Sequence, residues 1–224
     1  MLHAVAENLS SIVAIAISPM PLVGLLFLLI TRSRGAAAVW TFGWMVAVFV
    51  GTGLSAVLGH SGAGQSASGT TDGGGVNWAA WVIGLLFLAL AFSSFKKLPK
   101  GDEKVPVPGW IDTLTKANIG WILGFAILLL LVNAKNTPLY IAMGTSIAGA
   151  GLSTAQEWGT IIITTVLSSA TPLAVTLVAY ILGDKAKDGL NALRDWLVQN
   201  NALVMGLLFL LLGVGQLSKA ILSL

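Results

Sequence analysis

Six stretches of the chain are long and apolar enough to cross a lipid bilayer. A spanning helix needs about 20 mostly apolar residues, and the 224-residue sequence supplies such runs at roughly 8–31, 36–58, 78–95, 118–150, 158–182 and 201–222. Only 9% of the residues are charged, whereas an ordinary soluble domain carries roughly 25%. The sequence therefore predicts an all-α membrane protein with six transmembrane helices, located in the cell membrane.

The basic residues predict how the chain is oriented. Ten of the twelve Lys and Arg residues fall in the connections that follow the first, third and fifth runs. The connections at 59–77 and at about 151–157 contain neither residue type. Because cytoplasmic loops carry an excess of Lys and Arg, we expect the three basic connections in the cytoplasm and both termini outside.

Two of the six runs contain polar interruptions with Pro. The first run contains SPMP at 18–21, and the fourth contains NAKNTP at 133–138. The fourth region stays largely apolar over 119–152, which as one helix would measure about 50 Å, against about 30 Å for the hydrocarbon core of a bilayer. Because Pro lacks an amide hydrogen and clashes with the preceding turn, helices 1 and 4 are predicted to be broken at these places.

The spacing of the interruptions indicates an internal duplication. Pro21 precedes Trp40 by 19 residues, and Pro138 precedes Trp158 by 20 residues. Halves with three helices each must have opposite orientations, which is the inverted-repeat plan of many secondary transporters. We therefore expect a first three-helix repeat at 1–95, a cytoplasmic linker at 96–117 and a second repeat at 118–224.

Three pairs of residues are suited to start half helices inside the membrane. The pairs are Ser18-Pro19, Thr137-Pro138 and Thr171-Pro172. In each pair a Ser or Thr, a typical N-cap residue, directly precedes a Pro, which is tolerated at the first helical position. Free N–H groups at such helix starts form a binding site for anions. The expected substrate-binding residues are Ser18, Pro19, Pro21, Asn133, Lys135, Asn136, Thr137, Pro138, Thr171 and Pro172.

Lys135 is the most informative of these residues. A charge at the bilayer centre costs at least about 2.5 kcal/mol, and no acidic residue lies deep within a predicted span to neutralise it. Three roles stay open: a cation for an anionic head group, a proton-exchanging group that couples transport, or a structural donor to the carbonyls of broken helices. Glu157, at the outer end of the fifth run, is either a gating or ion-pairing residue or a solvated cap.

Composition excludes several other function classes. The chain has no Cys and only two His residues, far apart in sequence, which excludes thiol chemistry and argues against a metal site. A net charge of +3 does not favour nucleic acid. No pair of acidic, His or Ser/His groups shares a span, so we expect neither an enzyme nor a cofactor.

Four short motifs resemble a known family. ISPMP at 17–21, R-x-R at 32–34, FGW at 42–44 and N-x-K-N-x-P at 133–138 are similar to motifs of the actinobacterial peptidoglycolipid or sulfolipid addressing proteins, within the lysine exporter superfamily. The resemblance extends over essentially the whole chain. It implies export of large glycolipids or their precursors across the cytoplasmic membrane. The family's paired proline motifs fall on Pro19 and Pro21, and on Asn133, Lys135, Asn136 and Pro138.

The leading hypothesis is a secondary transporter that exports or flips glycolipids or lipid precursors, with the head group near Lys135. The alternatives are an amino-acid or small-solute exporter of the lysine exporter type, and a non-transporting scaffold for lipid synthesis and export. The expected partners are membrane lipids, with a lipid synthesis or export complex and a homo-oligomer left open. A lateral opening between helices that leads to Lys135 would favour the lipid hypothesis. The lipid itself, the coupling ion, the direction of transport and the oligomeric state are not determined by the sequence.

Overall fold

The computed structural model describes residues 1–60, 78–99, 104–133 and 135–222, and the regular secondary structure of these residues is entirely helical. The elements are α1 (Leu2–Glu7), α2 (Leu9–Ala16), α3 (Pro19–Thr31), α4 (Arg34–His60), α6 (Trp78–Lys96), α7 (Trp110–Lys116), α8 (Ile119–Leu131), α9 (Asn136–Gly149), α10 (Thr154–Ser168), α11 (Ala170–Leu182), the 3-10 helix η1 (Gly183–Ala186) and α12 (Lys187–Leu222). Most of the expected outer connection at 59–77 and part of the expected linker lie outside the described residues.

Both predicted helix breaks are present. The chain bends by 40° between α2 and α3, and by 73° between α8 and α9. The first break lies at Ile17 and Ser18, directly before Pro19. The second follows Leu131 and ends where α9 begins at Asn136. Because Pro cannot donate to the preceding turn, the first break lies where the sequence predicted it.

Fewer spans are identified by length and composition than the six that the sequence predicts. Among the described residues, Arg34–His60 and Ala170–Ser218 are long and apolar enough to cross a bilayer, and the two bent pairs raise the number to four. The remaining apolar helix, Ala80–Lys96, is shorter. The predicted fifth run is divided at Ser169, and the sixth run continues from α11 through α12. The length and apolar composition of these helices fit a membrane protein. The inverted repeat of six helices stays a prediction.

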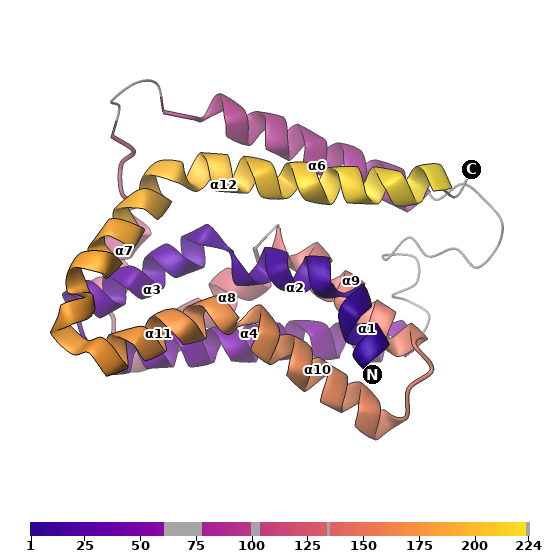
Figure 1. Cartoon of the computed structure of the whole chain (residues 1–224), viewed down its shortest axis with the longest axis horizontal. Helices are drawn as coiled ribbons and strands as arrows, with labels where there is room; N and C mark the ends of the chain where they lie inside the picture. The colour runs from indigo at the N-terminus through magenta and orange to yellow at the C-terminus, as the bar shows by residue number, and fades with distance from the viewer. Residues whose placement is uncertain (61–77, 100–103, 134, 223–224) are drawn as a thin grey trace.

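The helices form two groups. The pair α6 and α12 runs side by side along one flank of the molecule (Figure 1). This pair is close because a side chain covers each of three glycines: Leu217 contacts Gly84, Phe95 contacts Gly206 and Leu88 contacts Gly213. In the second group α4 packs along α8 and α9, around a core that includes the fully buried Trp40 and Trp44.

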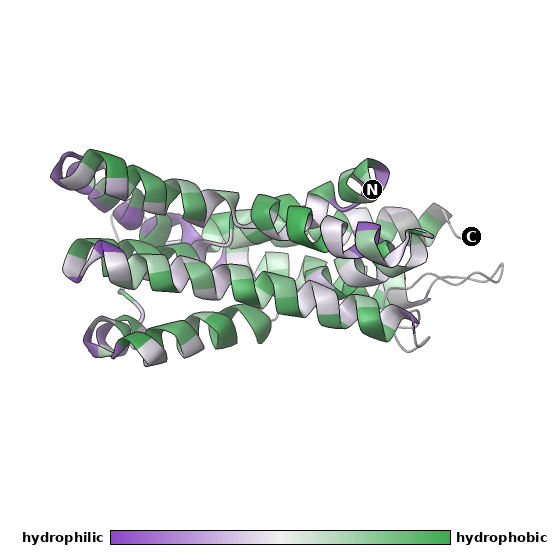
Figure 2. Ribbon diagram, turned by 90° about the horizontal axis from the view of Figure 1, so that it is seen from below, coloured by the Kyte–Doolittle hydropathy of each residue, from purple (hydrophilic) through white to green (hydrophobic). Residues whose placement is uncertain are grey.

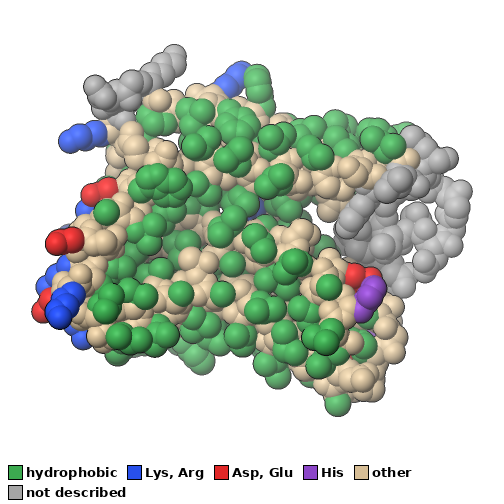
Figure 3. All heavy atoms as spheres, viewed as in Figure 1, with side chains coloured by type: hydrophobic (Ala, Val, Ile, Leu, Met, Phe, Trp, Pro, Cys, Tyr) green, Lys and Arg blue, Asp and Glu red, His purple; other side chains and the backbone are tan. Residues whose placement is uncertain are grey.

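The charged side chains are concentrated at one end of the molecule. Figure 2 shows the hydrophilic residues toward the ends of the helices, and Figure 3 shows Lys, Arg, Asp and Glu gathered at the end away from both termini. Lys187 and Asp184 form an ion pair of 3.0 Å there. The hydrogen bond and charge of Lys187, with a smaller contribution from Arg34, hold the pKa of Asp184 below its ordinary value. The long flanks between the ends are apolar, as a bilayer requires.

Candidate functional site

The two helix breaks meet in the interior of the helical group. The Ser18 hydroxyl, from the first break, lies 3.4 Å from the amide oxygen of Asn136, in the second. The Lys135 ammonium donates a hydrogen bond of 2.6 Å to the backbone carbonyl of Ala14, in the last turn of α2. These two contacts join segments about 120 residues apart in sequence and bring together Ser18, Lys135 and Asn136 of the predicted site.

The geometry of the first break explains why Lys135 binds Ala14. In a regular helix the Ala14 carbonyl accepts from the amide of Ser18, four residues later. The Ser18 amide instead donates to Ile15, at 3.1 Å, so the break frees the carbonyl. Lys135 satisfies it, and the ammonium lies at a helix C-terminus, where a cation is favoured. Because Lys135 is only 1% exposed, this contact corresponds to the structural role among the three that were left open.

Side chains of the second break satisfy the carbonyls at the end of α8. The Thr137 hydroxyl lies 2.9 Å from the carbonyl of Leu131 and 3.0 Å from that of Asn133. The Tyr140 hydroxyl donates to Leu130 at 3.3 Å. The amide oxygen of Asn133 accepts from the backbone N–H of Lys135 at 3.0 Å. The polar residues of this segment therefore replace hydrogen bonds that the broken helix has lost.

Two of the three predicted helix starts are displaced. Ser18 is the N-cap of α3 and Pro19 is its first residue, as predicted. Helix α9 starts at Asn136 with Lys135 as the N-cap, and α11 starts at Ala170 with Ser169 as the N-cap. Pro138 and Pro172 are therefore the third residues of their helices, and the predicted caps Thr137 and Thr171 are wrong. The physical reason is that no amide in the first turn has a helical acceptor, so Pro fits at the third position as well as at the first.

A third break lies at Ser169, between α10 and α11. In the described part of the chain it shares no hydrogen bond with the other two breaks. Pro172 is buried, and neither it nor Thr171 bonds to the residues of the first two breaks. Helix α11 instead contacts α4 through the hydroxyls of Thr41 and Thr176, 2.7 Å apart. Helix α11 also contacts α2 and α3, so Thr171 and Pro172 differ from the other predicted residues in their hydrogen bonds and not in belonging to a separate part of the fold.

The meeting point of the breaks retains an unsatisfied polar group. Asn136 is fully buried, and its side-chain nitrogen has no hydrogen-bond partner with normal geometry, although the Tyr140 hydroxyl is close enough to interact with this amide. A buried donor without an acceptor costs about 1–3 kcal/mol. Asn136 therefore keeps an unused hydrogen-bond donor at the contact between the two breaks.

A cavity of about 490 Å³ opens beside the second break. It lies between α8 and α12, and Figure 3 shows the surface hollowed between the layer of α6 and α12 and the other helices. Leu128 and Val132 are 57% and 71% exposed, so the cavity opens sideways from the helices. It is lined by Phe125, Leu128, Leu129, Val132, Asn133, Lys135, Met205 and Phe209. The lining is apolar except where it reaches Asn133 and Lys135. A lateral opening of this kind is the feature that would favour the lipid hypothesis over the others.

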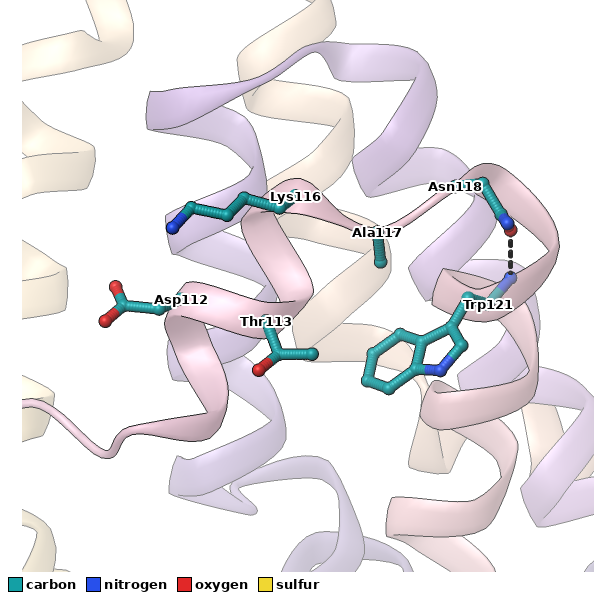
Figure 4. A pocket seen from close by; sticks show the side chains of 6 residues that line it. All are labelled: Asp112, Thr113, Lys116, Ala117, Asn118 and Trp121. Carbon is teal, nitrogen blue, oxygen red and sulfur yellow. Dashed lines mark hydrogen bonds between the residues drawn. The ribbon is translucent and has the colours of Figure 1, made fainter.

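A second cavity, of about 500 Å³, lies where α7 meets α8. Figure 4 shows Asp112, Thr113 and Lys116 on its α7 side, and Asn118 and Trp121 at the start of α8. The Asn118 side chain accepts a hydrogen bond of 2.8 Å from the backbone N–H of Trp121. These residues were not predicted as a site from the sequence. The pattern that could have indicated them is a short segment that combines Asp, Lys, Asn and Trp next to an apolar run.

Glu157 has a partner at the opposite end of the molecule from most of the charged residues. Its carboxylate oxygens lie 2.9 and 3.1 Å from His60 Nε2. Glu157 is in the first turn of α10 and His60 is in the last turn of α4. The pair connects two helix ends, so Glu157 is not merely a solvated cap. Among the described residues, no three His, Asp or Glu side chains come together as metal ligands.

Comparison with known proteins identifies one related family. The model of the family described as SfLAP, "Sap, sulfolipid-1-addressing protein", matches residues 11–222. The matched range includes both helix breaks and both cavities. No curated protein and no solved structure matches the chain significantly.

Proposed function

The chain belongs to the sulfolipid-1-addressing protein family, and from this premise we propose that it is an integral membrane transporter that exports or flips glycolipids or their precursors across the cytoplasmic membrane. The apolar helices are those of a membrane protein. The proposal includes six spans arranged as an inverted repeat, with the basic end in the cytoplasm. It involves no covalent chemistry and no cofactor.

The cavity between α8 and α12 is the observation that carries the proposal. It is lined almost entirely by apolar side chains, and it is open on the flank that would face lipid. Acyl chains can occupy such a space without leaving an apolar environment, which costs little free energy. The cavity also reaches Asn133 and Lys135, where a polar head group can form hydrogen bonds.

The contact between Lys135 and Ala14 suggests how lipid movement is coupled to the helix breaks. An anionic group beside Lys135 competes with the Ala14 carbonyl for the ammonium, because a hydrogen bond between two charged groups is stronger than one from the ammonium to a neutral carbonyl. Release of Ala14 removes one of the two hydrogen-bond contacts that join the first break to the second. In this mechanism the head group separates the two breaks as it passes, and Lys135 binds Ala14 again afterwards.

The proposal is tested by filling the cavity. Leu129→Trp places a large side chain in the space between α8 and α12, and Leu177→Trp is the matched control because Leu177 is an exposed residue of α11 that lines neither cavity. The measurement is the share of newly labelled glycolipid that can be extracted from the cell surface, at equal levels of membrane protein. We expect Leu129→Trp to lower this share and Leu177→Trp to preserve it. Equal surface lipid for the native protein and Leu129→Trp would refute the proposal.

The two other hypotheses make different demands on the same cavity. A small-solute exporter needs an enclosed site in which a few polar groups bind the carboxylate, whereas this cavity is open on one side. A non-transporting scaffold, which would support a lipid synthesis or export complex, does not need the cavity at all. Normal surface lipid in Leu129→Trp, with loss on changing the basic surface, would favour the scaffold.

A further inference from the structure

One face of α8 and the residue that caps it line both cavities. Asn118 and Trp121 line the cavity at the junction with α7, and Phe125, Leu128, Leu129 and Val132 line the cavity opposite α12. These positions follow one another at helical spacing, and the 14 steps from 118 to 132 correspond to about 21 Å. A neighbouring face of α8 is buried through Ile122, Ala126 and Leu130. The two cavities therefore lie in a row along one stripe.

Two stacked aromatic rings connect the cavities. The rings of Trp121 and Phe125 have centroids 4.7 Å apart and are inclined by 17°. Trp121 lines the first cavity and Phe125 lines the second. Trp121 remains 41% exposed, so a ligand can reach the part of its ring that Phe125 does not cover.

The first cavity combines polar groups with an aromatic surface. Asp112 and Lys116 form no ion pair within the described residues, although they are four positions apart on α7. Arg32, a second cation, donates a hydrogen bond to the carbonyl of Ala117 in the cavity wall. The two positive charges of Lys116 and Arg32 outweigh the single negative charge of Asp112, so the region attracts an anionic group. Asp112 accepts hydrogen bonds from hydroxyl groups, and the indole of Trp121 offers an apolar surface.

We infer that the junction of α7 and α8 binds the head group of a membrane lipid that is anionic and carries hydroxyl groups, while its acyl chains lie along α8 in the cavity opposite α12. The inference rests on the proposed function and adds a loading site for it, at the charged end of the molecule. The head group is bound first by Lys116, Asp112 and Trp121. Lys135 is about one acyl-chain length away, and it keeps its contact with Ala14 until the lipid moves.

Lipid binding to the purified full-length chain in detergent tests the inference, with native mass spectrometry as the measurement. The probes are phosphatidylglycerol, whose head group is anionic and hydroxylated, and phosphatidylcholine with the same acyl chains. We expect phosphatidylglycerol to bind more tightly. Lys116→Gln removes a charge-assisted contact and should weaken its binding by about tenfold. Trp121→Leu should weaken it as well.

The controls use residues of the same types at other positions. Lys185→Gln and Trp196→Leu change an exposed Lys and an exposed Trp that line neither cavity. Both should bind phosphatidylglycerol like the native chain. Glycerol phosphate, which has no acyl chains, should compete only weakly if chains and head group bind together.

Three results would overturn the inference. They are native-like binding of phosphatidylglycerol by both Lys116→Gln and Trp121→Leu, competition by glycerol phosphate as strong as that by the lipid, and loss of surface lipid in Trp121→Leu without loss of lipid binding. The last result would indicate a protein partner at the junction. If the binding pattern is as expected but Leu129→Trp leaves surface lipid unchanged, the proposed function fails and the lipid site stands. If Leu129→Trp lowers surface lipid but the junction variants bind normally, the lipid site fails and the function stands.

Discussion

A lysine buried in an apolar helical protein needs a partner for its ammonium group, and here the partner is a backbone carbonyl. Lys135 donates to Ala14 across the two helix breaks and is 1% exposed. A broken helix leaves carbonyls without donors, and a long side chain that carries three N–H groups is well suited to reach one of them. Lys135 therefore stabilises the break in the conformation described.

Removing the Lys135 side chain should destabilise the protein. Lys135→Ala leaves the Ala14 carbonyl buried and without a donor, which costs about 1–3 kcal/mol. Thermal unfolding in detergent should show a lower midpoint for Lys135→Ala. Lys185→Ala, at an exposed residue that forms no ion pair within the described chain, should unfold like the native protein. An unchanged midpoint for Lys135→Ala would show that the contact with Ala14 does not stabilise the fold.

At the scale of the helices, the close approach of α4 and α9 holds the second half helix in place. A Cβ atom on Gly144 would lie 2.5 Å from Ser55 Cβ and 2.5 Å from the carbonyl oxygen of Thr52. These separations are shorter than real carbon contacts, so the helices can approach this closely only because residue 144 is Gly. The position of α9, and with it that of Lys135 and Asn136, depends on this packing.

Gly144→Ala should separate α4 from α9. The expected cost of overpacking is about 1–3 kcal/mol. Gly149→Ala is the matched control on the same helix, because a Cβ atom there meets nothing within 4 Å. Urea or thermal unfolding should show a loss of stability for Gly144→Ala and none for Gly149→Ala. Equal stability of the two variants would contradict the packing described for these helices.

For the whole molecule, the helix breaks could be predicted from the local sequence, whereas the long-range packing is known only from the structure. The bend before Pro19 follows from one missing N–H group, and it was predicted correctly. The start of α9 was wrong by two residues because Pro138 fits at more than one position of a first turn. The contact of Lys135 with Ala14 joins residues 121 positions apart, so the sequence left three roles open. Neither cavity could be located, because each depends on where helices fail to pack.

The orientation of the molecule can be measured because the chain contains no Cys. If the basic end is cytoplasmic, a cysteine in place of His3 should react with a membrane-impermeant maleimide added to intact cells. A cysteine in place of Lys185 should react only after the membrane is permeabilised. Mass tagging of the labelled protein reports both reactions. Labelling of the Lys185 position alone in intact cells would reverse the proposed orientation.

The central claim is that lipid passes through the space between α8 and α12, and a reversible cross-link across this space tests it most directly. Leu129→Cys and Met205→Cys, on opposite walls of the cavity, can be joined by a cell-permeable, reducible bis-maleimide, with the cysteine-free native chain treated in the same way as the control. We predict that the surface-extractable share of newly labelled glycolipid falls on cross-linking and recovers when the linker is reduced. An unchanged share in cells whose protein is fully cross-linked would contradict the account.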